Sequence, residues 1–558
     1  MRITRFQAGT LIVLAIIFLT FWPALNNGFV WNDSALAGSP VFYDFNLLWQ
    51  VLSGQIRDPQ FNLSPLSALL FYFENSFFGG RPFGFHLVSL TVHLLNTVLL
   101  IYLLFKIWPT EDNARLVTAQ HLIALIYALH PALLEPVAYI SAQPELFSAF
   151  FMLLSLVLLE SGLKFNKFLA ALFYLFSLLF SLYAVIFIFI LPFWLKYRKK
   201  PVSLRTYLYF LFPLALSFVL YYLAVFRPPS VNASSVDIYS AATLISRTVL
   251  EYLSVLVFPF YALRPVHYLA PISDPLSIPA LISYAVVIGL LTLFIRLKKV
   301  FPDGFWLAAT VLFSFLPLLN IIPVTFPGGS IASERYLAFP LALAIIFITH
   351  VIFKLTDGHR LKKRVYLFYC FLLIWAVFSI RTVQSTLPKW KNDFALFEWA
   401  SQKAPESYLP DLKLAENYLK IRQYQKAMRS AAEAQTLAPK NPATWRIKAE
   451  IYLARGDTQS AVLLLKEALK LSKDNSLTLT ALGKALIQAK KYKEAIGYLN
   501  KALKLNPLSA DIHILLAEGY FNLKQKKEAK AHLEAANRYA TRTELRRLQN
   551  IKQRLGTK

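Results

Sequence analysis

The sequence contains little cysteine and little charge. Cys370 is the one cysteine among 558 residues, and charged residues make up 16% of the chain, whereas soluble globular chains carry about 25%. A single cysteine excludes a disulfide framework and a cysteine-based zinc or iron–sulfur site. The scarcity of charge, together with 56% hydrophobic residues, excludes an ordinary cytoplasmic enzyme and a disordered chain.

Several common catalytic motifs are also missing. The sequence has no glycine-rich loop of the kind that cradles phosphates, no nucleophile elbow and no metal-ligand motif. We therefore expect no cofactor, and a divalent metal is not indicated.

Long apolar runs dominate the first part of the chain and then stop. They recur up to about Arg381, and the mean hydropathy of the whole chain is +0.48. From Pro388 onward no window reaches the roughly 18 apolar residues that cross a bilayer. The chain is also too long for one soluble domain. We predict an all-α protein with a transmembrane helix bundle over 1–387, including a long first non-cytoplasmic loop over 26–84, and a second domain over 388–558.

Eleven segments of the first part are predicted to span the membrane. They cover residues 8–25, 85–107, 119–138, 145–160, 167–182, 184–197, 206–226, 276–296, 304–322, 336–354 and 365–383. The run Leu244–Leu263 contains Arg247 and Glu251, so it is predicted to be an interfacial or re-entrant helix. Counting it as a twelfth span would reverse the orientation of everything after it.

Lysine and arginine are distributed unevenly between the loops. With eleven spans, the basic loops all lie on one side, and the positive-inside rule makes that side cytoplasmic. The N-terminus is then cytoplasmic, as an uncleaved first span, and the C-terminal domain extracytoplasmic, most simply at a bacterial inner membrane. Residues 391–558 hold 31 Lys and Arg against 16 Asp and Glu. In an exported domain this surplus points to acidic protein surfaces or anionic lipid headgroups, and not to nucleic acid.

The C-terminal third has a 34-residue period. Alanines recur at this step in two series, Ala427, Ala461, Ala495 and Ala529, and Ala434, Ala468, Ala502 and Ala536. Small residues at this spacing are typical of tetratricopeptide repeats, in which paired helices touch. We predict an α-solenoid of four repeats, at about 408–441, 442–475, 476–509 and 510–541. Its concave face would hold a peptide or a partner protein; the alternative is a spacer without a ligand.

Ionisable residues at the outer ends of the predicted spans suggest a site. Such groups are costly at membrane depth and usually line a cavity. Asp33, just past the first span, could act as general base on a hydroxyl, and Arg335 could hold the phosphate of a lipid-linked donor. Amphipathic helices in the first loop could guide the lipid tail.

Each of these residues also has a purely structural interpretation. Asp33 could begin a turn or cap a helix, and Glu334 with Arg335 could form an interfacial ion pair or a topology anchor. Glu135, which precedes a proline, could cap or kink a helix. His86 and His93 would then be hydrogen-bonding residues of the bundle rather than metal ligands.

Several motifs, in order along nearly the whole chain, resemble those of one family. They are Phe29-Val30-Trp31-Asn32-Asp33, Ser64-Pro65-Leu66-Ser67, Pro82-Phe83-Gly84-Phe85-His86, His93 with Asn96, His130-Pro131 with Glu135, Tyr252 to Pro259, Ser333-Glu334-Arg335-Tyr336-Leu337 and Trp390-Lys391-Asn392-Asp393. The chain resembles the tetratricopeptide-bearing transmembrane O-mannosyltransferases and their bacterial relatives, which have the GT-C glycosyltransferase fold.

The resemblance implies a reaction and roles for particular residues. It implies transfer of a sugar from a polyprenyl-phosphate donor to Ser or Thr of an acceptor protein on the non-cytoplasmic side. Asp33 would be the base, and Arg335 would face the donor phosphate. The remaining substrate-binding residues would be Glu135, Glu145, Glu334, Arg81 and His86.

The sequence also departs from the family at four polar positions. It has Asn32-Asp33 where the family usually has two acidic residues, Ser64 where an arginine is usual, Leu182-Tyr183 in place of a Lys-Glu pair, and Gln143-Pro144-Glu145 in place of an Arg-Asp setting. Two hypotheses therefore remain: a glycosyltransferase, and a catalytically degenerate GT-C membrane anchor that displays the repeats as an assembly scaffold. A third alternative is an oligosaccharide ligase that acts on a lipid-linked glycan.

Overall fold

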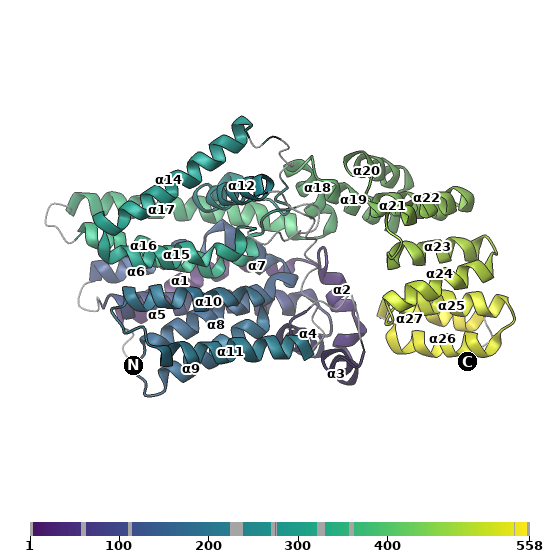
Figure 1. Ribbon diagram of the computed structural model, residues 1–558, viewed down its shortest axis with the longest axis horizontal. Helices are drawn as coiled ribbons and strands as arrows, with labels where there is room; N and C mark the ends of the chain where they lie inside the picture. Colours follow the sequence, from purple (N-terminus) through teal and green to yellow (C-terminus); the bar gives the residue numbers. More distant parts are fainter. Residues whose placement is uncertain are drawn as a thin grey trace.

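The computed structural model describes residues 4–56, 63–109, 114–223, 238–268, 274, 276–320, 330–356, 362–540 and 542–554. Every regular element in these ranges is a helix, and one isolated antiparallel bridge joins Tyr268 to Ser330. A bundle of long helices forms one part of the molecule, and paired shorter helices extend beyond one of its ends (Figure 1).

The bundle is built from the apolar segments. Its long helices are α1 (Arg5–Phe21), α5 (Pro82–Ile107), α6 (Ala114–Ala128), α8 (Gln143–Glu160), α9 (Asn166–Phe180), α10 (Ile186–Tyr197), α11 (Leu204–Leu223), α12 (Ile238–Val257), α14 (Ile278–Val300), α15 (Pro302–Ser314), α16 (Ala338–Thr356) and α17 (Lys362–Thr386). Prolines stand in the first turn of α5, α8, α14 and α15, where the missing N–H costs no intrahelical bond.

The number of segments that could cross a membrane differs from the prediction. Seven helical segments among the described residues are long and apolar enough: Arg5–Asn26, Pro82–Ile107, Ile140–Glu160, Leu204–Tyr222, Ile278–Val300, Glu334–Lys354 and Tyr369–Trp390. An eighth is possible if Leu116–Ala128 and Pro131–Ala138, which are bent by 54°, form one broken span. The other three predicted spans fall on the shorter apolar helices Asn166–Phe180, Leu182–Tyr197 and Pro302–Leu318. Helix α12 is not among the candidates.

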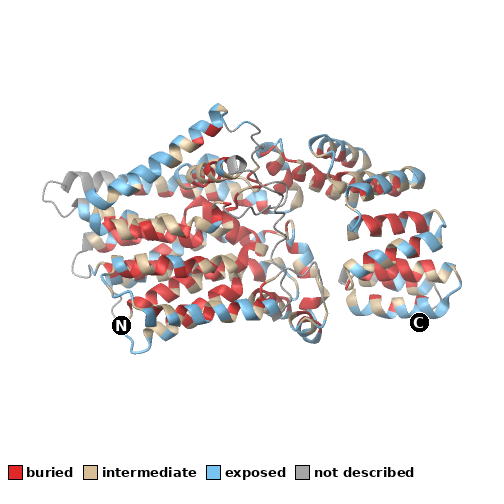
Figure 2. Cartoon of the chain, viewed as in Figure 1, coloured by how far each residue is buried: buried red, intermediate tan, exposed pale blue. Residues whose placement is uncertain are grey.

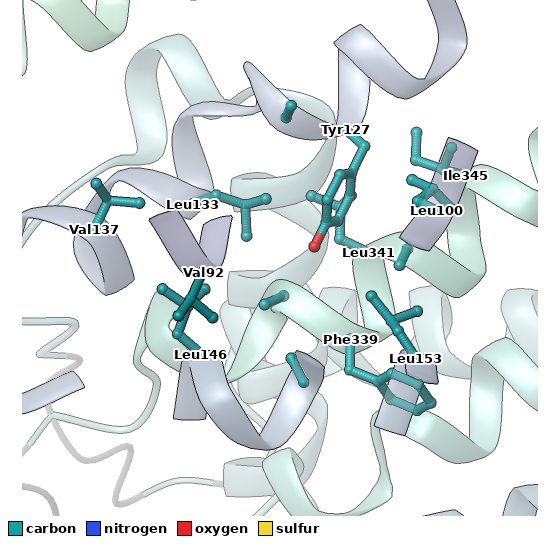
Figure 3. Packing of buried hydrophobic residues seen from close by; sticks show 14 of the residues in the cluster. Val92, Leu100, Tyr127, Leu133, Val137, Leu146, Leu153, Phe339, Leu341 and Ile345 are labelled. Atoms are coloured by element: carbon teal, nitrogen blue, oxygen red, sulfur yellow. The ribbon is translucent and has the colours of Figure 1, made fainter. Parts of the chain in front are cut away.

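The bundle has a closely packed, mainly apolar interior and an apolar exterior. Figure 3 shows the interior, where side chains of α5, α6, α8 and α16 interdigitate, among them Leu100, Tyr127, Leu153 and Phe339. Helix α14 is mostly exposed (Figure 2), yet it carries a row of exposed Ile and Leu side chains, including Ile282, Leu291 and Ile295. Large exposed apolar surfaces mark contact with a membrane or a partner.

Short helices between α1 and α5 form the first loop. They are η1 (Trp22–Asn26), α2 (Asp33–Gly38), η2 (Pro40–Phe42), α3 (Phe45–Leu52) and α4 (Pro65–Phe78). Their apolar faces form the main part of a second hydrophobic cluster, which includes Phe42, Leu48 and Phe71 and is joined by Phe85 of α5. Further short elements join the long helices: η3 (Pro131–Leu133), α7 (Leu134–Ala138), η4 (Ile140–Ala142), η5 (Leu182–Val185), α13 (Pro259–Ala262), η6 (Leu316–Leu318), η8 (Glu334–Leu337) and η10 (Leu387–Trp390).

The C-terminal helices form antiparallel pairs that stack on one another. After α18 (Asp393–Lys403) they are α19 (Tyr408–Lys420) with α20 (Tyr424–Leu437), α21 (Pro442–Ala454) with α22 (Thr458–Leu471), α23 (Ser476–Gln488) with α24 (Tyr492–Leu505), and α25 (Ala510–Asn522) with α26 (Lys526–Tyr539); α27 (Arg542–Arg554) follows. The eight periodic alanines are all buried, at 3% exposure or less. They let the helices of each pair approach closely, as the 34-residue period predicts.

Candidate functional site

An ion pair between Glu135 and Arg335 lies at the end of the bundle nearest the repeats. Glu135 lies on α7, just after the chain bends at Pro131, and Arg335 lies on η8, at the start of α16. The Nε and Nη2 atoms of Arg335 lie 3.1 and 3.0 Å from Oε1 of Glu135. The backbone N–H of Arg335 donates to Oε2 of the same carboxylate. Because two N–H groups of Arg335 contact the same carboxylate, the plane of the guanidinium is fixed.

Two further groups hold the Arg335 guanidinium. The hydroxyl of Ser333 lies 2.8 Å from Nε of Arg335 and also donates to Glu135. The ring of Tyr139 lies beneath the guanidinium, 5.1 Å from its central carbon, and Tyr139 in turn stacks on Trp31 of the first loop. The Arg335 side chain remains 21% exposed, so it is the cation of this cluster that a ligand could reach.

Glu145 adds a third ionisable group to this cluster. It lies in the first turn of α8, and its charge interacts with those of Arg335 and Glu135. Its Oε2 atom is buried and has no hydrogen-bond partner among the described residues. The structure therefore brings Glu135, Glu145 and Arg335 together from three separate segments.

A second network continues from Glu334. Oε1 of Glu334 lies 2.8 Å from Nε2 of His267, and Nδ1 of His267 lies 2.6 Å from Oε1 of Glu251. Arg264 is the last member of this network, and its Nε lies 3.0 Å from the same Glu251 oxygen. Burial opposes a charge on the ring, but the carboxylates of Glu334 and Glu251 outweigh it and raise the pKa of His267 to about 9. The ring is thus a buried cation between two carboxylates.

Asp33 is completely buried at the first turn of α2. Its Oδ1 accepts hydrogen bonds from the N–H and the hydroxyl of Ser141, at 2.8 and 2.6 Å. Its Oδ2 faces the N–H groups of Val30 and Ile140, at 3.3 and 3.4 Å. Burial raises the pKa of Asp33 to about 7, although the bonds from Ser141 pull it down. The carboxylate therefore joins the first loop to the segment that leads into α8.

Arg81 and His86 are not part of the ion cluster. Arg81 is exposed at the N-terminus of α5, and among the described residues it makes no ion pair with Glu135, Glu145 or Glu334. The ring of His86 is buried and faces the backbone of Gly28 and Val137. The ring therefore lies against α7 and the start of the first loop, and it is not part of the ion cluster.

The other polar motifs have structural partners. His93 contacts the carbonyl oxygen of Ala128, and Asn96 donates to that of Leu146, as expected of hydrogen-bonding residues in a bundle. The hydroxyl of Ser64 donates to the carbonyl of Phe180. Residues 321–329 of the loop before Ser333 lie outside the described part of the chain. Within that part, no three His, Cys, Asp or Glu side chains gather in a way that could hold a metal ion.

Sequence reasoning missed His267 and its partners. His267 stands alone in the sequence, and Glu251 was considered only as a charge that interrupts an apolar run. The bond from the N–H of His267 to the hydroxyl of Ser330 aligns the two segments, and this pairing is not visible in the sequence.

Comparisons with known proteins concern the C-terminal repeats. Residues 412–476 match a tetratricopeptide repeat family, and residues 454–536 match the family of the anaphase-promoting complex, cyclosome, subunit 3. These matches place tetratricopeptide repeats in this region, and repeat proteins of this kind commonly use an extended concave surface for binding. They do not extend to the helical bundle. No curated protein was matched.

Solved structures are similar to about a quarter of the chain. A thermophilic tetratricopeptide repeat protein from Thermus thermophilus is 22% identical, covering 28% of this chain and 90% of that one, with a TM-score of 0.27. A crystal structure of MamA is 18% identical, covering 27% and 91%, with a TM-score of 0.24. YrrB, described as having an unusual peptide-binding site, is 15% identical, covering 25% and 73%, with a TM-score of 0.22.

Proposed function

We propose that the protein is a membrane glycosyltransferase that moves a sugar from a polyprenyl phosphate to Ser or Thr of an acceptor protein. The proposal rests on the family resemblance and on one observation: the part-exposed guanidinium of Arg335 lies among Glu135, Glu145 and Tyr139. Arginine binds phosphate oxygens through its planar fork. The donor phosphate would take up the exposed edge of Arg335, while Glu135 holds the opposite edge.

Asp33 would supply the base. A carboxylate with a pKa of about 7 is matched to taking a proton near neutral pH. The proton of the acceptor hydroxyl would pass to Asp33 as the hydroxyl oxygen bonds to the sugar carbon and the phosphate leaves. Because Asp33 is fully buried, an acceptor hydroxyl reaches it only after the contact with Ser141 opens.

The repeats would recruit the acceptor on the same side of the membrane. Helix α8 begins at Gln143, beside the Asp33–Ser141 contact, and ends at Glu160, which binds Arg198 and Lys200. The candidate site and the basic loops are therefore separated by the length of one helix. In an eleven-span arrangement with a cytoplasmic N-terminus, the basic end is cytoplasmic, and the site lies extracytoplasmic with the repeats beside it (Figure 1).

The test is direct transfer by the purified protein in detergent. Radiolabelled polyprenyl-phosphate sugars are offered with membrane-extract proteins, and label in protein is counted. We expect Asp33→Asn to abolish transfer. Asp303→Asn is the matched control, since Asp303 is exposed at the start of α15 and pairs with Lys354. Transfer that is unchanged in Asp33→Asn would refute the assignment of the base.

A second candidate is a membrane-anchored scaffold without catalysis, which assembles a surface complex through its repeats. The observation that favours it is the engagement of Asp33 by four donors, which is what a purely structural carboxylate shows. Under this alternative no donor supports transfer, and Asp33→Asn lowers the melting temperature without affecting partner capture by the repeats.

A further inference from the structure

We propose that a groove on the outer face of the repeats binds an acidic segment of a partner polypeptide. The groove lies between α22 and α24 and has a volume of about 650 Å³. Five lysines line it, Lys466, Lys470, Lys473, Lys501 and Lys504, beside one aspartate and a floor of apolar and aromatic side chains. The proposal needs only the repeats, and it stands whether or not the bundle is catalytic.

The groove is on the outer face because of how the pairs stack. The first helices of successive repeats, α21, α23 and α25, contact one another in turn. The second helices, α22 and α24, diverge, and the space between them is the groove. A concave surface formed by the first helices is the usual ligand face of such solenoids, so the outer groove is a separate site.

The lysines keep their charge available. Lys473, Lys501 and Lys504 are exposed, and none of the three pairs with a carboxylate within the described repeats. Lys466 lies 3.6 Å from Glu494 and Lys470 lies 2.7 Å from Glu467, but these pairs are solvent-exposed and hence weak. An acidic ligand would meet a local excess of positive charge.

The floor of the groove favours a polypeptide over other anions. Leu469, Tyr498 and Leu505 are half-buried there, and Leu471 and Leu477 are exposed nearby, at 44% and 56%. Apolar contacts beside charges suit a peptide that carries both acidic and apolar side chains. A lipid surface fits less well because of where the groove lies. Helices α22 and α24 are farther from the bundle than α2 and α3 (Figure 1). A bilayer around the bundle would therefore contact α2 and α3 before it could reach the groove.

The test uses the full-length protein in detergent and a short fluorescent peptide in which Glu alternates with Leu. Binding is followed by fluorescence anisotropy, with a Gln–Leu peptide as the uncharged probe. We expect the acidic peptide to bind and K501E/K504E to weaken it by about tenfold or more, while K501R/K504R stays within about twofold of the original protein. The matched control is K526E/K527E, which makes the same charge change at two exposed lysines of α26.

Three outcomes would overturn the proposal. One is no binding of the acidic peptide. Another is an equal loss in K526E/K527E, which would show a response to net charge alone. The third is K501/K504-dependent binding of vesicles of equal parts phosphatidylglycerol and phosphatidylcholine without binding of the peptide, which would make the groove a lipid site. Hydrogen exchange of amides in α24 checks that the repeats of K501E/K504E remain folded.

Discussion

The backbone N–H of Trp31 donates a 2.6 Å hydrogen bond to Oδ1 of Asp393. The two residues are separated by 362 positions, and the bond joins the first loop to the helix that opens the C-terminal part. Trp31 has a positive φ of 55°, an uncommon conformation for a bulky residue. Two neighbouring bonds reinforce the junction: Gly28 N–H to the carbonyl of Lys391, and the Asn27 amide to that of Leu387.

Replacing Asp393 by alanine should loosen this junction. The charged acceptor is lost, so we expect a cost of about 1–3 kcal/mol and faster hydrogen exchange at the amide of Trp31. Asp393→Asn keeps an oxygen acceptor in place, so its stability and its exchange rate at Trp31 should lie between those of the original protein and of Asp393→Ala. Exchange at Trp31 that matches the unmodified protein in Asp393→Ala would show that Lys391 and Leu387 hold the loop alone.

The pH dependence of transfer should follow Asp33. A base acts in its charged form, and burial raises the pKa of Asp33 to about 7. Below that pH the transfer rate should rise about tenfold per pH unit, and above it the rate should level off. Initial rates measured with saturating donor between pH 5 and 9 check this, and a profile that is flat through pH 7 speaks against Asp33 as base.

His267 should make stability depend on pH in the alkaline range. Its pKa rises from 6.5 to about 9 on folding, so its contribution is fully present below pH 6.5 and is lost as the pH rises through 9. The change amounts to roughly 3 kcal/mol, because each pKa unit corresponds to about 1.4 kcal/mol.

The variant His267→Gln isolates this effect. It leaves Glu334 and Glu251 without the cation between them, so it should be less stable than the original protein at pH 6.5. The gap in melting temperature should close above pH 9. A gap that stays constant with pH would mean that the ring is neutral in the folded protein and acts by packing.

The repeats should respond to the loss of one core leucine. Leu499 of α24 is fully buried, whereas Leu463 of α22 is 62% exposed. Leu499→Ala should destabilise the repeats by about 2–5 kcal/mol, and Leu463→Ala by less than about 0.5 kcal/mol. Native-state hydrogen exchange of amides in α24 measures both, and similar values for the two variants would contradict the packing described here.

The solenoid could be predicted from sequence because its contacts are local. Alanines such as Ala461 and Ala495 face a helix only a few residues away along the chain, and the period repeats the same contact four times. The positions of the apolar helices were also predictable, since length and hydropathy are read within one segment. The number of helices that could cross a membrane was not predictable. The bend at Pro131 and the short lengths of α9, α10 and α15 are set by packing against neighbouring helices, which the sequence of one segment does not reveal.

The candidate site was predictable only in part. Glu135 and Arg335 were predicted as charges near the ends of apolar runs, and Glu145 was predicted from the family resemblance. The structure places the three together. Arg81 and His86 were also predicted to bind substrate, but Arg81 is exposed at the start of α5 and the ring of His86 faces the backbone of Gly28 and Val137. The row from Glu334 through His267 to Glu251 depends on the alignment of two distant segments, which no local pattern encodes.

The repeats touch the rest of the chain at both of their ends. Near Asp393 they join the bundle covalently, while Leu508 and Tyr539 pack against the apolar cluster of the first loop, and Arg538 donates to Gln50. A solenoid attached at one end can pivot about that attachment, whereas a solenoid attached at two points resists such rotation. Tension that a bound partner exerts on the repeats would therefore be divided between the covalent junction and the first loop, and would reach Asp33 through α2.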